Sequence, residues 1–290
     1  MPIRRIQSRV RKAGKRYRYH RARVRRMLFT VGPDRLSRGR LNRRHLAGEV
    51  VLSEVEIESP RWPSVWDGLR ILHVSDFHLG DLLPLDRALE IVASITRLKP
   101  DLVACTGDVV DLHHHDAPPL LEALGALAAP LGTMMVLGNH DELHCGETLE
   151  GMARRAGVTV LRSESAVCTN GDHTLTVAGI DWAKTQAKCA RQVQRACGWG
   201  KVDLLLAHNP KAFNAAANLN IPLTLSGHTH GGQVALKGRP NANLALGHRK
   251  SAGVFEDGDS RLFVTTGIGA WFPLRVNCPA EVAMITMRRS

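Results

Sequence analysis

The sequence predicts an α/β layered domain, on three observations. Short apolar runs recur from position 50 onward, and stretches of helical character separate several of them. Hydrophobic residues make up 44% and charged residues 23% of the 290 positions, which is close to globular averages and sufficient for a sizeable core. Alternation of buried strands with helices is typical of layered α/β domains. We therefore expect one large domain of this class behind a different N-terminal segment.

The expected strands are mostly continuous apolar runs. Such runs are typical of strands that are buried on both faces, and only the first one alternates in part. In chain order they are Val50–Ile57, Leu69–Ser75, Leu102–Thr106, Thr133–Leu137, Val158–Leu161, Leu175–Ile180, Val202–Ala207, Leu223–Ser226, Leu262–Thr265 and Val282–Met287. Helices are expected near residues 86–98, 118–129, 147–156 and 184–196.

The positive charge of the chain is concentrated at its N-terminus. The net charge is +12, and residues 1–45 hold seventeen of the 39 basic residues but one of the 27 acidic ones, Asp34. This leaves 22 basic and 26 acidic residues for positions 46–290. Because the body is slightly acidic, the charge does not indicate a nucleic-acid-binding fold. We divide the chain into a basic arm with a linker, residues 1–48, and a folded domain, residues 49–290.

Apolar residues in the arm recur with alternating steps of three and four. They form one stripe of a helix, at positions 3, 6, 10, 13, 17, 20, 24, 27 and 31, while Arg and Lys fill most other positions. A helix of this pattern is suited to an anionic membrane surface. A solvated basic tail and a nucleic-acid-binding arm are the alternatives, and the latter would need aromatic stacking residues or a basic face on the body. Residues 32–48, with Gly32-Pro33 and Gly39, are expected to be a linker.

No segment predicts membrane insertion or export. No window approaches the ~20 apolar residues of a membrane-spanning helix, and no apolar signal segment follows the basic N-terminus. The six cysteines contain no Cys-x-x-Cys pair, which favours free thiols in a reducing compartment. We expect a cytoplasmic protein that can attach to the inner membrane face through its arm.

Polar motifs follow five of the expected strands directly. Ligands in α/β sheets gather beyond the carboxyl ends of strands, so these motifs should meet at one place. A lone Asp-x-His or Gly-Asp is more often a turn or a helix cap, but five such motifs in order indicate a metal site. They are Asp76-Phe77-His78, Gly107-Asp108-Val109-Val110-Asp111, Gly138-Asn139-His140-Asp141, His208-Asn209 and Gly227-His228-Thr229-His230.

The five motifs together resemble the signature of the calcineurin-like metallophosphoesterase superfamily. The resemblance covers roughly residues 50–287 and implies a four-layer αββα sandwich of two packed mixed β-sheets. It also implies two divalent ions with one shared ligand, Asp108. The other ligands of the first ion would be Asp76, His78 and His230, and those of the second would be Asn139, His208 and His228.

A pair of divalent ions explains why this set of residue types is needed. Two cations held ~3.5–4 Å apart repel each other, so a shared carboxylate between them is required. Mixed imidazole and oxygen ligands suit Mn, which we expect first, or Fe, Zn, Co or Ni. Bound metal lowers the pKa of water to about 7, which supplies a hydroxide for in-line attack on phosphorus. The resemblance therefore predicts a phosphoester hydrolase.

The motif Gly138-Asn139-His140-Asp141 also supplies the expected acid–base group. By resemblance, His140 is a catalytic residue that does not bind metal, and it would stabilise or protonate the leaving oxygen. Asp141 is expected to hold the tautomer of His140, with a helix cap as the alternative. Asp111 is expected to orient its loop rather than to bind metal.

The substrate is less defined than the chemistry. The last motifs, with Gly231-Gly232-Gln233 and Thr266-Gly267-Ile268-Gly269, are similar to a bacterial subgroup that includes UDP-2,3-diacylglucosamine pyrophosphatases of the lipid A pathway. The apolar residues of the loop Leu79–Leu85 would either contact acyl chains or pack inward. A general phosphodiesterase or phosphatase for soluble substrates is one alternative, and a non-catalytic metal-binding scaffold is another.

Overall fold

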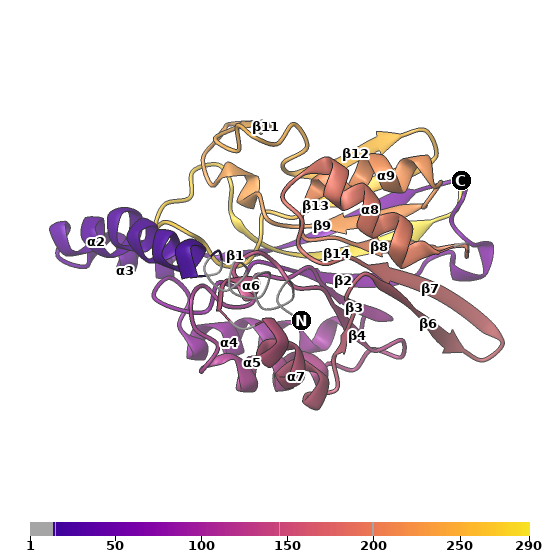
Figure 1. Ribbon diagram of the computed structural model, residues 1–290, viewed down its shortest axis with the longest axis horizontal. Helices are drawn as coiled ribbons and strands as arrows, with labels where there is room; N and C mark the ends of the chain where they lie inside the picture. Colours follow the sequence, from indigo (N-terminus) through magenta and orange to yellow (C-terminus); the bar gives the residue numbers. More distant parts are fainter. Residues whose placement is uncertain (1–13, 15, 145, 199) are drawn as a thin grey trace, which may run out of the picture.

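The computed structural model describes Gly14 and residues 16–144, 146–198 and 200–290, and it contains two six-stranded mixed sheets. The sheets pack face to face with helices on both outer sides (Figure 1). The first sheet has the order β1 (Val50–Glu58), β14 (Ala280–Arg288), β2 (Arg70–Val74), β3 (Leu102–Cys105), β4 (Thr133–Met135), β5 (Thr159–Val160). The second has the order β12 (Gly253–Asp257), β13 (Ser260–Val264), β9 (Leu223–Ser226), β8 (Leu204–Leu206), β7 (His173–Gly179), β6 (Glu164–Asn170).

Helices cover both outer faces because their apolar stripes match the sheets. On α4 (Leu85–Ile95), the buried residues are Ala88, Ile91, Val92 and Ile95, which recur at helical spacing. With α4, α5 (Ala117–Gly125) and α7 (Gly146–Arg155) cover the first sheet. The second sheet is covered by α8 (Gln186–Cys197) and α9 (Phe213–Asn218). The expected four-layer arrangement is therefore confirmed.

The core between the sheets is formed by the inward-facing residues of both. Ile71 and Leu102 from the first sheet and Leu204 and Leu225 from the second are fully buried in one apolar cluster. This explains why these strands are continuous apolar runs in the sequence. β6 is different because most of its residues are exposed at the edge of the second sheet. Its sequence therefore contains no apolar run from which the strand could be predicted. The two-stranded ribbon of β10 (Ala235–Leu236) and β11 (Arg239–Asn243) is separate from both sheets, and its strands are too short or too polar to form an apolar run.

Strand directions place the motifs at one edge. In the first sheet, β2, β3 and β4 are neighbours and run parallel. In the second sheet, β8 and β9 are also parallel neighbours. Their carboxyl ends carry the five motifs. Parallel neighbours end at the same edge of a sheet, and the two sheets bring their edges together.

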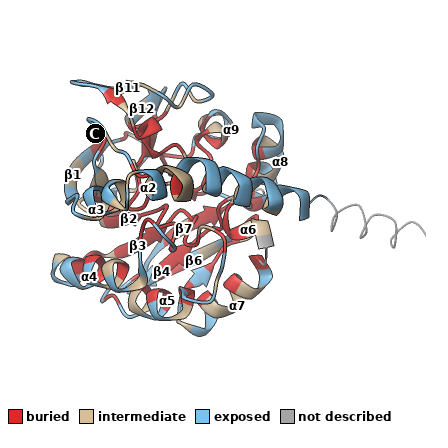
Figure 2. Ribbon diagram, turned by 90° about the vertical axis from the view of Figure 1, so that its left-hand side faces the viewer, coloured by how far each residue is buried: buried red, intermediate tan, exposed pale blue. Residues whose placement is uncertain are grey.

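The N-terminal arm lies against this edge. Residues 16–26 are helical and continue into a π-helical turn, η1 (Met27–Val31), and we call residues 16–31 the arm helix. The arm helix crosses the face of the domain in front of the sheets (Figure 2). Where a linker was expected, α2 (Gly32–Leu36) and α3 (Arg40–Leu46) are two short helices. Residues 1–13, the first part of the predicted stripe, lie outside the described residues.

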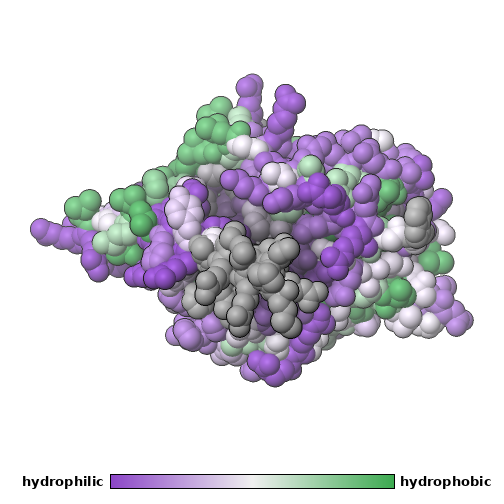
Figure 3. Space-filling view, in the orientation of Figure 1, coloured by the Kyte–Doolittle hydropathy of each residue, from purple (hydrophilic) through white to green (hydrophobic). Residues whose placement is uncertain are grey.

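The described part of the predicted stripe is not packed on the body. Tyr17, Val24 and Met27 are 64%, 58% and 49% exposed. Exposed apolar side chains also gather at the α2–α3 end and over the β11 segment (Figure 3). At these places Leu36, Leu244 and Leu246 are exposed. Among the helices that the structure describes, none has both the length and the apolarity required to cross a membrane.

Candidate metal centre

The first cluster of ligand atoms joins β2 to β9. Asp76, His78 and His230 are buried, and their ligand atoms lie within 4.8 Å of one another. The Nε2 atoms of His78 and His230 are 3.0 Å apart, and Nε2 of His230 lies 3.3 Å from Oδ1 of Asp76. Two ligands at ~2.1 Å from one ion, at right angles to each other, would be about 3.0 Å apart. The spacing of these atoms therefore fits a shared cation.

The second cluster joins β3 to β8 and β9. Asp108, His208 and His228 again have ligand atoms within 4.8 Å of one another. Nδ1 of His228 lies 3.2 Å from Nε2 of His208. Oδ2 of Asp108 lies 3.1 Å from Nε2 of His208 and 3.6 Å from Nε2 of His78. Because this one oxygen faces both clusters, Asp108 has the position of a bridging ligand.

An unsatisfied amide supports the presence of a second ion. Oδ1 of Asn139 is buried and has no hydrogen-bond partner in the described structure. A buried carbonyl oxygen without a partner is destabilising, and a cation would satisfy it. The donor set is carboxylate, amide oxygen and imidazole, which suits divalent transition metals. The residues present therefore fit a dinuclear metal centre.

The protonation of the cluster follows from its burial. Burial lowers the pKa of His230 to about 3 and, with His208 nearby, lowers that of His228, so both imidazoles are neutral. Burial alone would raise the pKa of Asp76, but His230 and His78 hold it well below its usual range. Against the effect of burial, hydrogen bonds to Asp111 and Asp76 raise the pKa of His78 to about 10, and Asp108 raises the pKa of His208 to about 9. Because neutral imidazoles and ionised carboxylates are the forms that bind metal, metal binding would release protons from these two histidines.

The backbone is strained at the ligands. Asp76, His78, Asp108, His228 and His230 all have positive φ, between 48° and 72°. Non-glycine residues rarely adopt this conformation, and it clusters at functional sites. The motif glycines permit close approach of the chains. A Cβ at Gly138 would lie 2.1 Å from Oδ1 of Asp108, and one at Gly227 would lie 2.1 Å from Oδ2 of Asp76.

His140 is oriented by Asp111, not by Asp141 as the sequence suggested. Nδ1 of His140 is 2.8 Å from the carbonyl oxygen of Asp111 and 2.9 Å from its Oδ1. Nε2 lies 2.8 Å from Nη2 of Arg25, which can only donate. Nε2 is therefore the acceptor in this arrangement, and Nδ1 carries the proton that is donated to Asp111.

Asp141 has a different role at the start of α6 (Asp141–His144). Its Oδ2 accepts the backbone N–H groups of Asp108 and Gly138, at 2.7 and 2.8 Å, and its Oδ1 accepts that of Val110, at 3.2 Å. Burial and the neighbouring Asp108 raise the pKa of Asp141 to about 6, so it is ionised at neutral pH. Asp141 therefore ties two motif loops together, which is closer to the capping alternative.

The comparisons with known proteins agree with this geometry. The profile of the calcineurin-like phosphoesterase family matches residues 69–232, which include all five motifs. The chain belongs to this family. It is therefore a metal-dependent phosphoester hydrolase.

Several relatives of this phosphoesterase are known by sequence. The chain is 28% identical to the uncharacterized metallophosphoesterase YkuE of Bacillus subtilis over 253 residues, which is 81% of this chain and 85% of the relative. It is 31% identical to the phosphodiesterase YaeI of Escherichia coli over 231 residues, 75% of this chain and 82% of the relative. Among solved structures, a 5'-nucleotidase precursor from Thermus thermophilus has a TM-score of 0.43 at 13% identity, over 76% of this chain and 54% of that one.

Beside the predicted ligands, the phosphoesterase places residues that the sequence did not single out. Trp182 lies with its ring 4.7 Å from that of His228, and His248 lies 5.2 Å from it. Arg25 comes from the arm helix. No local signal marks these residues, because each reaches the site from a segment outside the motifs. Asp111 had a signal: it is the last residue of Gly107-Asp108-Val109-Val110-Asp111.

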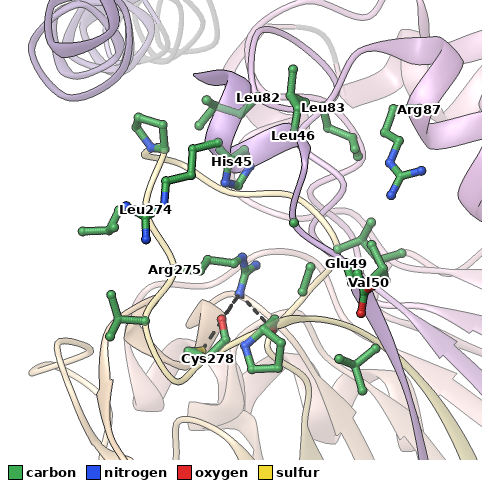
Figure 4. A pocket seen from close by; sticks show the side chains of 18 of the residues that line it. His45, Leu46, Glu49, Val50, Leu82, Leu83, Arg87, Leu274, Arg275 and Cys278 are labelled. Carbon is green, nitrogen blue, oxygen red and sulfur yellow. Dashed lines mark hydrogen bonds between the residues drawn. The ribbon is translucent and has the colours of Figure 1, made fainter. Parts of the chain in front are cut away.

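The loop after His78 packs inward, which was one of its two expected roles. Leu79, Leu82 and Leu83 are only 4–5% exposed. Leu82 and Leu83 line a cavity of about 540 Å³ between α3, α4 and the segment before β14 (Figure 4). At its centre the half-buried Arg275 donates to the carbonyl oxygens of Thr266 and Gly267, at 2.9 and 3.0 Å. Arg275 thereby fixes the loop that packs on Asp76.

Proposed function

We propose that this phosphoesterase hydrolyses a phosphodiester or pyrophosphate bond in an amphiphilic substrate, with UDP-2,3-diacylglucosamine as the specific candidate. One observation carries the proposal. A cavity of about 870 Å³ opens beside the metal centre and is lined by Asn139, His140 and His228 together with both basic and apolar side chains. The relative YaeI of Escherichia coli is a phosphodiesterase, which also supports the proposal.

The residues of the metal centre would have separate roles in hydrolysis. Two divalent ions would supply an activated water and neutralise charge on the phosphoryl oxygens. Asp108 would hold both ions, and Asp76 is fixed for its role by the backbone N–H of His228, 3.0 Å from Oδ2. His140 faces the cavity through Nε2, where it can meet the leaving oxygen. Asp111 is the positioning residue that holds the His140 ring.

The apolar part of the cavity favours a substrate with an apolar group. Tyr17, Val24 and Leu28 from the arm helix and Trp182 from the body line it. The three arm residues are at least 58% exposed, so they offer apolar surface that the protein itself does not cover. Burying one CH₂ group of a substrate contributes ~0.8 kcal/mol. An acylated phosphoester would therefore gain affinity along the arm helix.

The same residues support attachment to an anionic membrane surface. Apolar side chains stay exposed on a helix that also carries many arginines, and further exposed leucines lie at α2 and near β11. We propose that the enzyme works at the cytoplasmic face of a membrane. If about five basic residues approach the lipid at ~1 kcal/mol each, deleting residues 1–31 weakens vesicle binding by a factor on the order of 10³ to 10⁴. Equal sedimentation of both proteins with anionic vesicles at low salt would refute this location.

The decisive experiment compares two substrates that share one pyrophosphate. Metal-loaded enzyme is assayed in detergent with UDP-2,3-diacylglucosamine and with UDP-N-acetylglucosamine. We expect a kcat/KM at least 10²-fold higher for the acylated substrate, with UMP and the lipid monophosphate as products. Comparable values would remove the lipid assignment and leave a general phosphodiesterase. Absence of turnover for every phosphoester, with two metals bound, would favour a scaffold.

A further inference from the structure

We infer that the arm helix supplies a second anion subsite, in which Arg18 and Arg21 bind the phosphate of a diphosphate ester that is not attacked, while Arg25 contacts the phosphate that is attacked. The inference rests on the proposed function, because it assumes that the scissile phosphate lies at the metal centre. It assigns a role in substrate recognition to the arm, which lies outside the five motifs.

Arg25 connects the arm to the reacting groups. Its Nη2 lies 2.8 Å from Nε2 of His140, and its guanidinium carbon lies 5.4 Å from the centre of the Trp271 ring. An arginine has five N–H donors and no acceptor, so only one is used on His140. A phosphoryl group that enters between them would receive N–H bonds from Arg25 and meet His140 at the same time.

The charge of the cavity points to a substrate with more than one phosphate. Its described lining contains three arginines of the arm helix and, across from them on the body, Lys184 and Lys211, with no carboxylate among the lining residues. A single phosphate at the metal centre would leave the more distant cations without a partner. Because cations gathered around one cavity repel one another, an anion between these walls is favoured.

The spacing of the arginines fits a chain of phosphates. Residues 18, 21 and 25 are three and four positions apart, so they lie on one face of a helix. At 1.5 Å per residue, Arg18 and Arg25 are about 10 Å apart along the axis. The row of arginines therefore begins at Arg25, which contacts His140, and Arg21 and Arg18 lie about one and two helical turns further toward the N-terminus. Arg23 lies two positions from Arg25, on the opposite face, and does not line the cavity.

The arm helix is held in place by contacts on its other faces. Arg26 forms an ion pair with Asp81, and the hydroxyl of Thr30 donates to the carbonyl oxygen of Trp271 at 3.2 Å. Phe29 packs edge-on to the Trp271 ring, with ring centres 6.1 Å apart. Arg18 and Arg21 line the cavity, where the guanidinium carbon of Arg21 lies 5.8 Å from the centre of the Tyr17 ring.

The test uses the full chain loaded with Mn²⁺ and two variants of it. Both variants carry substitutions in the arm helix, but on opposite faces. Arg18→Ala/Arg21→Ala removes the outer part of the subsite, and Arg23→Ala removes a charge from the opposite face. The substrates are UDP-N-acetylglucosamine, which has two phosphates, and bis(4-nitrophenyl) phosphate, which has one. For the double variant we expect KM to rise about tenfold with the first substrate and less than twofold with the second. Arg23→Ala should match wild type with both.

A binding measurement separates this inference from the proposed function. Inorganic pyrophosphate is titrated into each metal-loaded protein, and its Kd should rise about tenfold in the double variant and stay unchanged in Arg23→Ala. If no ester is hydrolysed but this difference appears, the proposed function fails and the subsite stands. Equal losses in both variants would overturn the subsite. A rise in kcat/KM in Arg25→Ala would also overturn it, since the arm would then be a plug.

Discussion

The two walls of the active-site cavity are built in different ways. The body wall includes Asn139, His140 and His228. Behind it, Asp76, Asp108, His208 and His230 are at most 2% exposed, and each follows a buried strand. On the arm wall, Arg18, Arg21 and Arg25 are exposed, and a few side-chain contacts hold the helix. A buried wall fixes the geometry that hydrolysis needs, while an exposed wall can adjust to a substrate. Substitutions on the body wall should therefore affect all substrates, and those on the arm wall should affect some.

Removing the shared ligand should have the largest effect. Asp108→Ala leaves two cations without a carboxylate between them, so we expect metal content to fall below two per chain and kcat/KM to fall on the order of 10⁴-fold for every ester. Elemental analysis and kinetics measure both. Asp172→Ala, at an exposed turn, is the matched control. Two bound metals and near-normal turnover in Asp108→Ala would contradict a bridging role.

Removing His140 should separate acid–base chemistry from metal binding. In His140→Ala we expect two metals to remain and kcat to fall 10²–10⁴-fold, the usual contribution of a general acid or base. Its ligand atom lies within 4.8 Å of those of His78 and Asp108, so metal binding must be measured rather than assumed. If elemental analysis shows metal loss in this variant, His140 is a ligand and the assignment is wrong.

Asp111 and Asp141 both lie near His140, but substituting them should have different effects: the first on kcat and the second on stability. Asp111→Asn keeps the shape of the side chain but weakens its hold on the His140 ring, and we expect kcat to fall about 10-fold to 100-fold with KM and metal content unchanged. Asp141→Ala leaves three buried N–H groups without a partner and should destabilise the fold by several kcal/mol. Urea denaturation and kinetics together distinguish them. A loss of stability in Asp111→Asn equal to that in Asp141→Ala would remove the distinction.

Deleting the arm should have the smallest effect on the simplest ester. Without residues 1–31, we expect the midpoint of thermal unfolding to change by only a few degrees, because the core between the sheets is untouched. Hydrolysis of bis(4-nitrophenyl) phosphate should fall about tenfold through the loss of Arg25. Collapse of the fold or complete loss of metal on deletion would show that the two walls are one structural unit.

The convergence of the predicted ligands follows from the sequence and the place of the arm does not, for a physical reason. Each predicted ligand follows a strand within a few residues, and parallel neighbours bring their ends together, so order along the chain is enough to place them near one another. Arg25 and His140 are 115 residues apart and meet through tertiary packing that no local pattern encodes. The stripe did predict a helix, and residues 16–31 are helical, but it indicated neither the cavity nor the body as its neighbour.

Asp111 and Asp141 show a finer limit. Both follow a glycine motif, and both are aspartates near His140, so their roles look interchangeable in sequence. Their roles differ because their side chains point in different directions. The Asp111 carboxylate faces the His140 ring, and the Asp141 carboxylate faces backbone N–H groups. Side-chain direction depends on local φ and ψ, which the residue types around these two aspartates do not reveal.

The five left-handed ligands have a consequence for how such an enzyme can change over generations. At ~1–2 kcal/mol each, they would together oppose folding by roughly 5–10 kcal/mol, which is comparable to the whole net stability of a typical domain. Exchange of one ligand for Gly or Asn, which tolerate this conformation, relieves strain as it abolishes activity. Lineages released from selection for hydrolysis would thus lose their ligands without losing their fold, and the same scaffold would persist as a binding protein.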